Sequence, residues 1–372
     1  MPDKSVKFFT SVMSGAPQSN GDAGTFVAIL DACLVNGFGT VTLDSVVVSN
    51  NVATCTKSAG HGFAMTGGIG PVIAIAGATP DALNGEWRIA SVPSNTVFTF
   101  TTVGISNQTA TGTITAKRAP AGWTKPFSGT NKAAYRSASP QSTGCYLRFD
   151  DSMASGTDLN CSLTMYESMS DIDTGSGAGT ALGMRRRTGT YNFTRTWKVY
   201  ADSRAFYLLV NTMSANNGYG GSGHCFFGDL ARPAAAADAW YCALATGGAN
   251  VSEGMPVIDN ETNGRFARSY NQIDKNVAMR RRSHRANPTY VGIGGGAYVP
   301  EIGMLVHQVE AWQGASYYRG LMPGWYGLVH PATFTWAEDY YQHLEIGTMA
   351  GYLMYTAGTD TPQMFDISGP WR

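Results

Sequence analysis

Two clusters of arginine are the most unusual chemical feature of a sequence in which only 14% of the residues are charged. Arginine presents a planar fork of donors that binds a carboxylate through two hydrogen bonds at once. Each cluster could dock an acidic patch on a partner, or it could be a solvated strand edge or form pairs within the chain. The candidate subunit-interface residues are Arg185, Arg186, Arg187, Arg280, Arg281, Arg282 and Arg285.

A second group of side chains could bind a ligand by stacking. Its members are Trp312, Tyr317, Tyr318, Trp325 and Tyr326. Aromatic rings on loops can stack on sugars, whereas aromatic residues of β proteins usually fill the core. Both alternatives stay open, and we take Trp325 and Tyr326, in the glycine-bounded segment 320–327, as candidate ligand-contact residues.

The sequence DIDTGSG at 171–177 has the alternating acidic pattern of a calcium loop. A full loop of this type has a bidentate glutamate at its twelfth position, where this chain has Leu182. A polar turn, in which the aspartates cap backbone N–H groups, is therefore the favoured interpretation. The glycine-rich GIGGG at 292–296 is not followed by Lys-Ser or Lys-Thr and does not predict a nucleotide site.

The histidines and carboxylates lack the spacings that catalysis needs. The six histidines show no HxH, HExxH or HxxxH pattern, and no GxSxG motif marks a nucleophile. The pairs Asp150–Asp151 and Glu338–Asp339 are sequence neighbours, and neighbours on a strand point to opposite faces. We expect no enzyme, no metal and no cofactor, with a site assembled from distant positions as the alternative.

The composition indicates a protein that is covered by neighbours in an assembly, with a monomer whose surface consists of Ser, Thr, Asn and Gly as the alternative. Basic and acidic residues balance at 26 each, so the formal net charge is zero, while solubility as a lone monomer usually relies on charge. A zero net charge also argues against nucleic acid as the main partner. The six cysteines are spread singly, which predicts buried, reduced thiols. No segment has the pattern of a secretory signal or a membrane span.

The 45 glycines and 16 prolines indicate frequent turns, and the runs between them favour Thr, Val, Phe and Tyr, so we expect a mainly β fold in three parts. Residues 1–40 form an N-terminal arm with one short helix, capped by Asp22 and ended by Asn36-Gly37. Residues 41–117 form a small β-sandwich or barrel with a turn at Asn50-Asn51 and with strands at 46–48, 52–56, 72–76, 86–91, 96–102 and 111–115. Residues 118–372 form a larger β-rich domain, in which 333–345 is a helix or a strand and turn. The sequence leaves open whether the helix packs on the chain itself or on a neighbouring subunit.

Several segments together resemble a family of virion structural proteins from tailed bacteriophages. They include VKFF at 6–9, MSGAP at 13–17, LDACLVNGFG at 30–39, AGWTKPFSGTN at 121–131, YESMSD at 166–171, FGD at 227–229 and FDISGPWR at 365–372. The segments GHGF at 60–63, IAGATP at 75–80 and LNG at 83–85 are similar to immunoglobulin-like modules of phage tail proteins. The resemblance therefore implies a small immunoglobulin-like sandwich followed by a larger C-terminal β-sandwich.

This resemblance implies a non-enzymatic structural component of the virion, made in the host bacterial cytoplasm. We expect it in the tail tip, baseplate or neck, in symmetric copies such as a trimer or hexamer, with other virion proteins as partners and without nucleic acid or membrane. The alternatives are a receptor-binding or tail-fibre module that recognises host surface glycan, and a capsid decoration or minor head protein. A glycan-degrading enzyme is a further, less favoured alternative.

Overall fold

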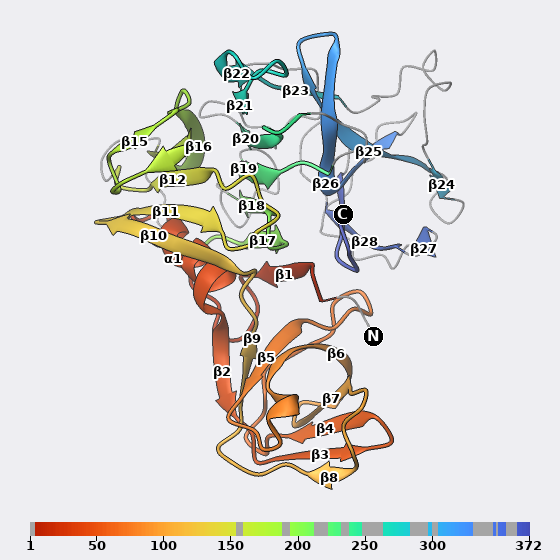
Figure 1. The fold of residues 1–372 in the computed structure, drawn as a ribbon. Helices are drawn as coiled ribbons and strands as arrows, with labels where there is room; N and C mark the ends of the chain where they lie inside the picture. Colours follow the sequence, from red (N-terminus) through yellow and green to blue (C-terminus); the bar gives the residue numbers. More distant parts are fainter. Residues whose placement is uncertain are drawn as a thin grey trace.

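The computed structural model describes residues 4–153, 159–187, 194–211, 222–231, 238–247, 263–282, 297–299, 304–329, 345–346, 349–354 and 363–372. These residues are mainly β, as the sequence predicts (Figure 1). A body of stacked sheets lies at one end of the molecule, and a separate β module lies at the other. The glycine-rich loop at 292–296, Arg285 and all but the last residue of the segment 333–345 lie outside the described residues.

The middle layer of the body, the central sheet, is buried on both faces. Its strand order is β1 (Lys7–Thr10), β17 (Trp197–Ala201), β18 (Ala205–Asn211), β19 (Ser222–Asp229), β20 (Cys242–Thr246), β21 (Gly264–Arg268) and β22 (Lys275–Ala278), all antiparallel. Along β18, Phe206 and Leu208 belong to one hydrophobic core, and Tyr207 and Leu209 belong to another. This alternation explains why β18 reads as an unbroken apolar run, since each face of the sheet needs its own apolar residues.

One face of the central sheet is covered by the outer sheet. Its order is β10 (Trp123–Gly129), β11 (Lys132–Ser137), β12 (Tyr146–Asp150), β13 (Leu159–Tyr166) and β16 (Leu182–Arg187), and the hairpin of β14 (Ser168–Met169) and β15 (Gly175–Ser176) follows β13. Tyr135, Leu147 and Leu163 point from this sheet into the core shared with the central sheet. The outward positions of β11 are consequently Lys132, Ala134 and Arg136, which alternate with the inward ones.

The opposite face of the central sheet is covered by the C-terminal sheet (Figure 1). Its order is β23 (Arg280–Arg282), β25 (Met304–Gln313), β26 (Tyr317–Val329), β29 (Gln363–Asp366), β28 (Met349–Met354) and β27 (Glu345–Ile346), and β24 (Ala297–Val299) also pairs with β25. Met322, Trp325 and Phe365 meet Tyr207 and Phe226 of the central sheet in one buried cluster. The body thus has three β layers with a hydrophobic core on each side of the middle one.

The β module consists of one strongly curved sheet. Its order is β2 (Phe38–Thr42), β9 (Thr115–Arg118), β5 (Val72–Ala76), β6 (Gly85–Ser94), β7 (Val97–Thr101), β4 (Val52–Thr56), β3 (Ser45–Ser49) and β8 (Gln108–Thr109), with a short 3-10 helix η2 (Asp81–Leu83). The expected strands at 52–56 and 72–76 match β4 and β5. The turn at Asn50-Asn51 is confirmed, since both residues have positive φ. The expected strand at 111–115 is wrong, because the chain there leads into β9.

The expected helix is present, but its N-terminal cap is not the predicted one. α1 (Thr25–Leu30) continues as a π-helical segment η1 (Asp31–Asn36) and ends at Gly37, which has a φ of 71°. Its N-cap is Gly24 rather than Asp22, and the N–H of Phe26 donates instead to Oδ2 of Asp151 at 2.9 Å. Asp22 contributes its backbone carbonyl to Thr25, so its side chain is not the cap.

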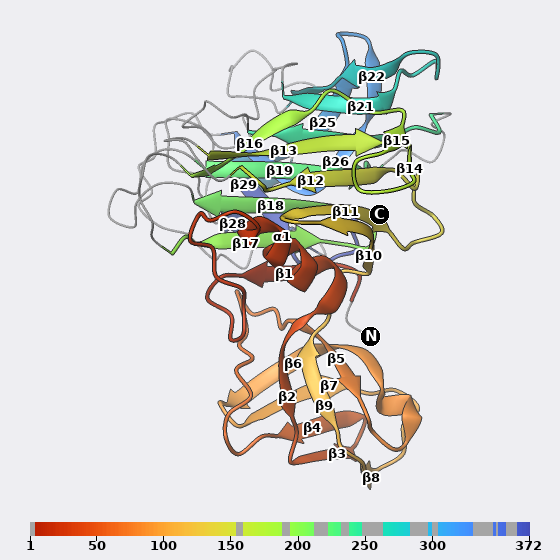
Figure 2. The same ribbon diagram turned by 90° about the vertical axis from the view of Figure 1, so that its left-hand side faces the viewer.

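The helix packs on its own chain. Phe26, Ile29, Leu30, Cys33 and Leu34 are fully buried in the core between the outer and central sheets. Strand β1, which precedes the helix, pairs with β17 in the register Lys7 with Ala201 to Thr10 with Lys198. The first forty residues therefore contribute a strand and a helix to the body before the chain enters the β module (Figure 2).

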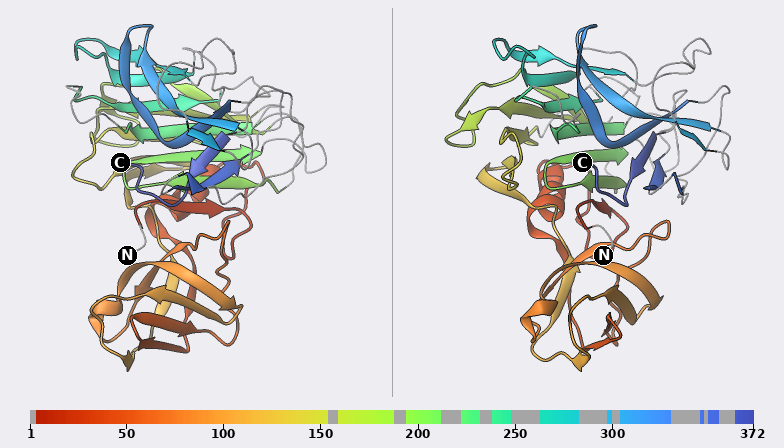
Figure 3. Two further views of the ribbon diagram at one scale, coloured as in Figure 1. Left: turned by 90° about the vertical axis from the view of Figure 1, so that its right-hand side faces the viewer. Right: turned by 45° about the vertical axis from the view of Figure 1, so that its right-hand side comes forward.

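Arginine side chains of the β module hold it against the segment that precedes it. Arg88 Nη2 donates to the carbonyl of Val6 at 2.8 Å, and Arg118 Nη1 donates to the carbonyl of Ser14 at 2.8 Å. Arg118 Nη2 also donates to Gly62 within the module at 2.8 Å. Burial lowers the pKa of Arg118 to about 10, so it still carries its charge at neutral pH. The junction seen in Figure 3 is thus fastened by charge-assisted hydrogen bonds.

Candidate functional site

In the first arginine cluster, at 185–187, the central residue makes its contacts inside the body. Arg186 is fully buried, and its guanidinium forms an ion pair with the equally buried Asp151. Arg186 Nη1 also donates to the Asp151 carbonyl at 2.8 Å. Arg185 is 9% exposed. The prediction of a subunit interface is therefore wrong for Arg186, because an ion pair with no exposed side-chain surface cannot contact another subunit. The side chain of Arg187 is outside the described part.

Asp151 connects three elements at this point. Its carboxylate accepts hydrogen bonds from the Phe26 N–H of α1 and from the Cys161 thiol of β13, at 2.9 and 3.0 Å. Burial raises the pKa of Asp151, and the charge of Arg186 opposes that rise. Asp150, its sequence neighbour, instead pairs with Arg148 at 3.1 Å on the other face of the outer sheet. The two carboxylates point apart, as the strand geometry predicts.

The second arginine cluster forms strand β23 of the C-terminal sheet. Arg280, Arg281 and Arg282 pair with Trp312, Ala311 and Glu310 of β25. Arg280 is half-buried, and Arg285 lies outside the described residues. A role of this strand in subunit contact stays a prediction.

Trp325 is a core residue, so its assignment as a ligand contact is wrong. Its side chain is fully buried and stacks on Phe365 with ring centroids 6.1 Å apart, while Tyr207 meets it edge-on at 5.9 Å. A ring enclosed between two sheets cannot reach a ligand. Tyr326 is half-buried, and burial together with the charge of Asp366 raises the pKa of its hydroxyl to about 12.

The strands β21 and β22 and the hairpin of β25 and β26 reach the end of the body that is farthest from the β module (Figure 1). We call this surface the aromatic tip: Tyr270 and Ile273 in the turn between β21 and β22, and Tyr317 at the start of β26. Tyr270 and Tyr317 stack with centroids 5.4 Å apart and an interplanar angle of 20°. They are 38% and 51% exposed, and Ile273 is 75% exposed. Tyr317 was among the predicted stacking residues, whereas Tyr270 and Ile273 were missed, because single apolar residues in a polar turn give no pattern.

Hydrogen bonds from the buried Arg319 side chain connect the segments that carry the aromatic tip. This side chain is fully buried and pairs with Asp238 through Nε. Its Nη1 donates to Gln313 Oε1 at 2.8 Å, and the same oxygen accepts the Tyr270 N–H at 2.8 Å. Further bonds from Nη1 and Nη2 reach the carbonyl of Arg268, and Nη2 also binds the carbonyl of Trp240. The turn that carries Tyr270 is therefore fixed relative to the hairpin that carries Tyr317.

The acidic sequence at 171–177 forms the polar turn between β14 and β15. Asp171 Oδ1 accepts the Asp173 N–H at 2.8 Å, as in an Asx turn. Asp173 pairs with Lys132 at 3.1 Å and with Arg148 at 2.5 Å, so its carboxylate is neutralised by two cations. Within the described ranges no three His, Cys, Asp or Glu side chains are grouped so that they could hold a metal ion.

The six cysteines are buried and unpaired, which confirms the prediction for these thiols. Burial raises the pKa of Cys55 and of Cys225 to about 12. Thiols in this state are protonated at neutral pH and are poor nucleophiles.

Neither a protein-family model nor a curated protein matches this sequence. In the part of the chain that the structure describes, no helix is long and apolar enough to cross a membrane.

Proposed function

We propose that this chain is a non-enzymatic structural component of a tailed-phage virion, placed in the tail tip, baseplate or neck in symmetric copies such as a trimer or hexamer. The observation that carries the proposal is the aromatic tip, where Tyr270, Ile273 and Tyr317 expose apolar surface on a chain with little charge. Exposed apolar surface of this kind favours protein contacts. The β module would then correspond to the immunoglobulin-like unit, and the three-layered body to the larger β domain, that the phage resemblance implies.

The use of buried ionisable groups also supports a structural role. Asp151 with Arg186 joins α1 to the outer sheet, and Arg319 with Asp238 holds the aromatic tip. Asp229 accepts both the N–H and the hydroxyl of Thr143, which ties the central sheet to the segment before β12. Each of these groups makes hydrogen bonds that connect different elements of the fold.

Purified particles test the proposal. We expect the protein at a fixed ratio to the major tail protein, and labelled antibody at one place on the particle in electron micrographs. The double variant Tyr270→Ser/Tyr317→Ser should fold normally but enter particles poorly, whereas Val12→Ser, at a residue that is 80% exposed elsewhere, should be incorporated normally. Finding the protein only in lysate, with none in purified particles, would refute the role.

The second candidate is recognition of a host receptor, with the aromatic tip as the contact surface. It is favoured by the stacked, half-exposed pair of Tyr270 and Tyr317, since aromatic rings provide large contact areas at low entropic cost. Soluble protein should then compete with adsorption of the phage, and the double variant should not. Normal incorporation of the double variant, combined with defective adsorption, would favour this candidate over assembly.

A further inference from the structure

Two neighbouring aromatic rings lie on the outward face of the outer sheet. Phe127 of β10 and Tyr146 of β12 reach toward each other across β11, with centroids 6.3 Å apart and an interplanar angle of 27°. The residue of β11 that pairs with Phe127 is Ala134, whose methyl group is fully buried. A small residue at that place lets both rings lie over β11. Both rings are partly exposed, so we call this surface the aromatic floor.

Arg136 borders the aromatic floor with its guanidinium in a fixed position. It pairs with Tyr146 in the β11–β12 register, and its Cζ lies 5.1 Å from the centroid of that ring. Its Nε donates to the carbonyl of Gly144 at 3.0 Å. Stacking and this hydrogen bond together orient the two terminal nitrogens, and the side chain is exposed. A guanidinium held in this way is prepared to bind a carboxylate through two hydrogen bonds.

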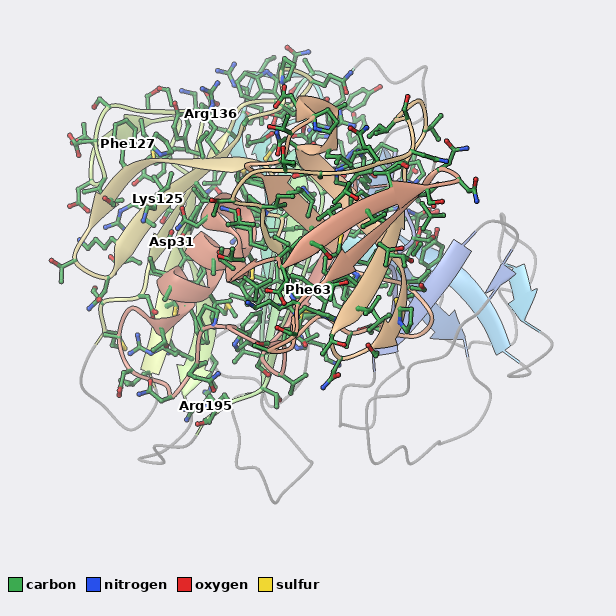
Figure 4. The ribbon with its side chains drawn as sticks, turned by 90° about the horizontal axis from the view of Figure 1, so that it is seen from below. Asp31, Phe63, Lys125, Phe127, Arg136 and Arg195 are labelled. Atoms are coloured by element: carbon green, nitrogen blue, oxygen red, sulfur yellow. The ribbon has the colours of Figure 1, made fainter. Side chains whose placement is uncertain are left out.

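The other cations of β10, β11 and β12 are already neutralised. Lys125 pairs with Asp31 at 2.5 Å on the side of α1, and Figure 4 shows Phe127 and Arg136 away from that pair. Lys132 and Arg148 share the carboxylates of Asp150 and Asp173. Among the described residues, no carboxylate lies within ion-pair distance of Arg136. The aromatic floor therefore carries one uncompensated positive charge.

We propose that the aromatic floor and Arg136 bind an acidic saccharide, with the sugar ring over Phe127 and Tyr146 and its carboxylate on the Arg136 guanidinium. Nearly parallel rings suit the apolar face of a pyranose, and the forked donor selects a carboxylate over a hydroxyl. An acidic peptide side chain would use the arginine but would not need two rings. This site goes beyond the proposed virion role.

The test uses the full chain and compares acidic with neutral sugars. Trigalacturonate and sialyllactose are titrated by NMR at up to about 10 mM, against maltotriose and triglutamate at the same concentrations. Arg136→Gln should weaken binding of the acidic sugar by about tenfold or more, because it removes a hydrogen-bonded charge pair. Arg136→Lys should bind at an intermediate level, and Tyr146→Leu should weaken binding of the sugar. Val103→Ser, at a residue of the β module that is 63% exposed, is the matched control.

Stronger binding of an acidic sugar than of maltotriose and triglutamate, lost in Arg136→Gln and kept in Val103→Ser, supports the proposal. Any of three results overturns it: neither acidic sugar binds, maltotriose binds equally well, or triglutamate binds equally well and is unaffected by Tyr146→Leu. Because Arg136 and Tyr146 are on the surface of a folded sheet, unchanged circular dichroism of the variants separates loss of binding from loss of structure.

Discussion

Replacing Arg319 tests how the aromatic tip is built. The guanidinium makes five hydrogen bonds among the described residues, which match the five donors that an arginine has. Its partner Asp238 is buried, with a side chain that is 1% exposed. Arg319→Met keeps a long apolar side chain beside Phe266, over whose ring the guanidinium lies at 4.2 Å, but removes every donor.

The expected cost follows from the burial of the pair. Removing one partner of a buried ion pair destabilises a protein by about 3–5 kcal/mol, because the other charge is left without compensation. We expect Arg319→Met to lower the free energy of unfolding by that amount. Arg319→Lys keeps the charge but has three donors, so at least two hydrogen bonds are lost at about 0.5–1.5 kcal/mol each. Its expected loss is about 1–3 kcal/mol.

Urea denaturation followed by fluorescence and circular dichroism measures these differences, and coincident transitions establish that one unfolding event is observed. Arg136→Met is the control, because that arginine is exposed and its loss should cost less than about 1 kcal/mol. Hydrogen exchange in 263–282 and 304–329 should accelerate in Arg319→Met. An unfolding free energy within about 1 kcal/mol of the wild type, with unchanged exchange in these segments, would show that Arg319 does not hold the tip.

Three further outcomes are expected. Asp151→Ala leaves Arg186 buried without a carboxylate and removes the α1 cap, so urea denaturation should show a loss of about 3–5 kcal/mol; a loss below about 1 kcal/mol would contradict this. The paired Arg268 guanidinium lowers the pKa of Glu167 from 4.5, so its contribution to stability is present above about pH 4.5 and is lost as the pH falls through the lower, folded-state pKa. Wild-type stability should therefore fall more steeply below pH 4.5 than that of Glu167→Gln, and parallel curves would refute the assignment. The six thiols should react with a thiol reagent only after unfolding, and rapid reaction of the native protein would reveal an exposed one.

The sequence predicted correctly those elements that depend on residues close to one another in the chain. The helix formed by α1 and η1 is determined by the spacing of its apolar residues and by the glycine that follows it. Nearby residues likewise determine β4, β5 and the Asn50-Asn51 turn. The cap of α1 could not be found in this way, since Asp151 is more than a hundred residues from Phe26. Asp22 has the right residue type but lies two residues before the N-cap, Gly24, and the distant Asp151 carboxylate accepts the Phe26 N–H.

The predictions of site residues were wrong where a side chain is buried by an element distant in the sequence. Trp325 lies among glycines and a proline, which locally indicate an exposed loop, but the central sheet covers β26 and encloses the ring. Arg186 is likewise hidden because α1 and Asp151 close over β16. The aromatic floor depends on the β10–β11–β12 register, which brings together residues that have no relation in the sequence.

Because β1 pairs with β17, β1 cannot take its place in the central sheet until much of the chain has been synthesised. Lys7 and Ala201 are separated by about 190 residues, so a ribosome adding 5–20 residues per second leaves Phe8 and Phe9 without a partner strand for roughly 10–40 s. The strands of the β module lie wholly within that interval and can pair during it. A chaperone could protect the two phenylalanines during this interval, and a nascent chain stopped before Trp197 would still leave them without their partner strand.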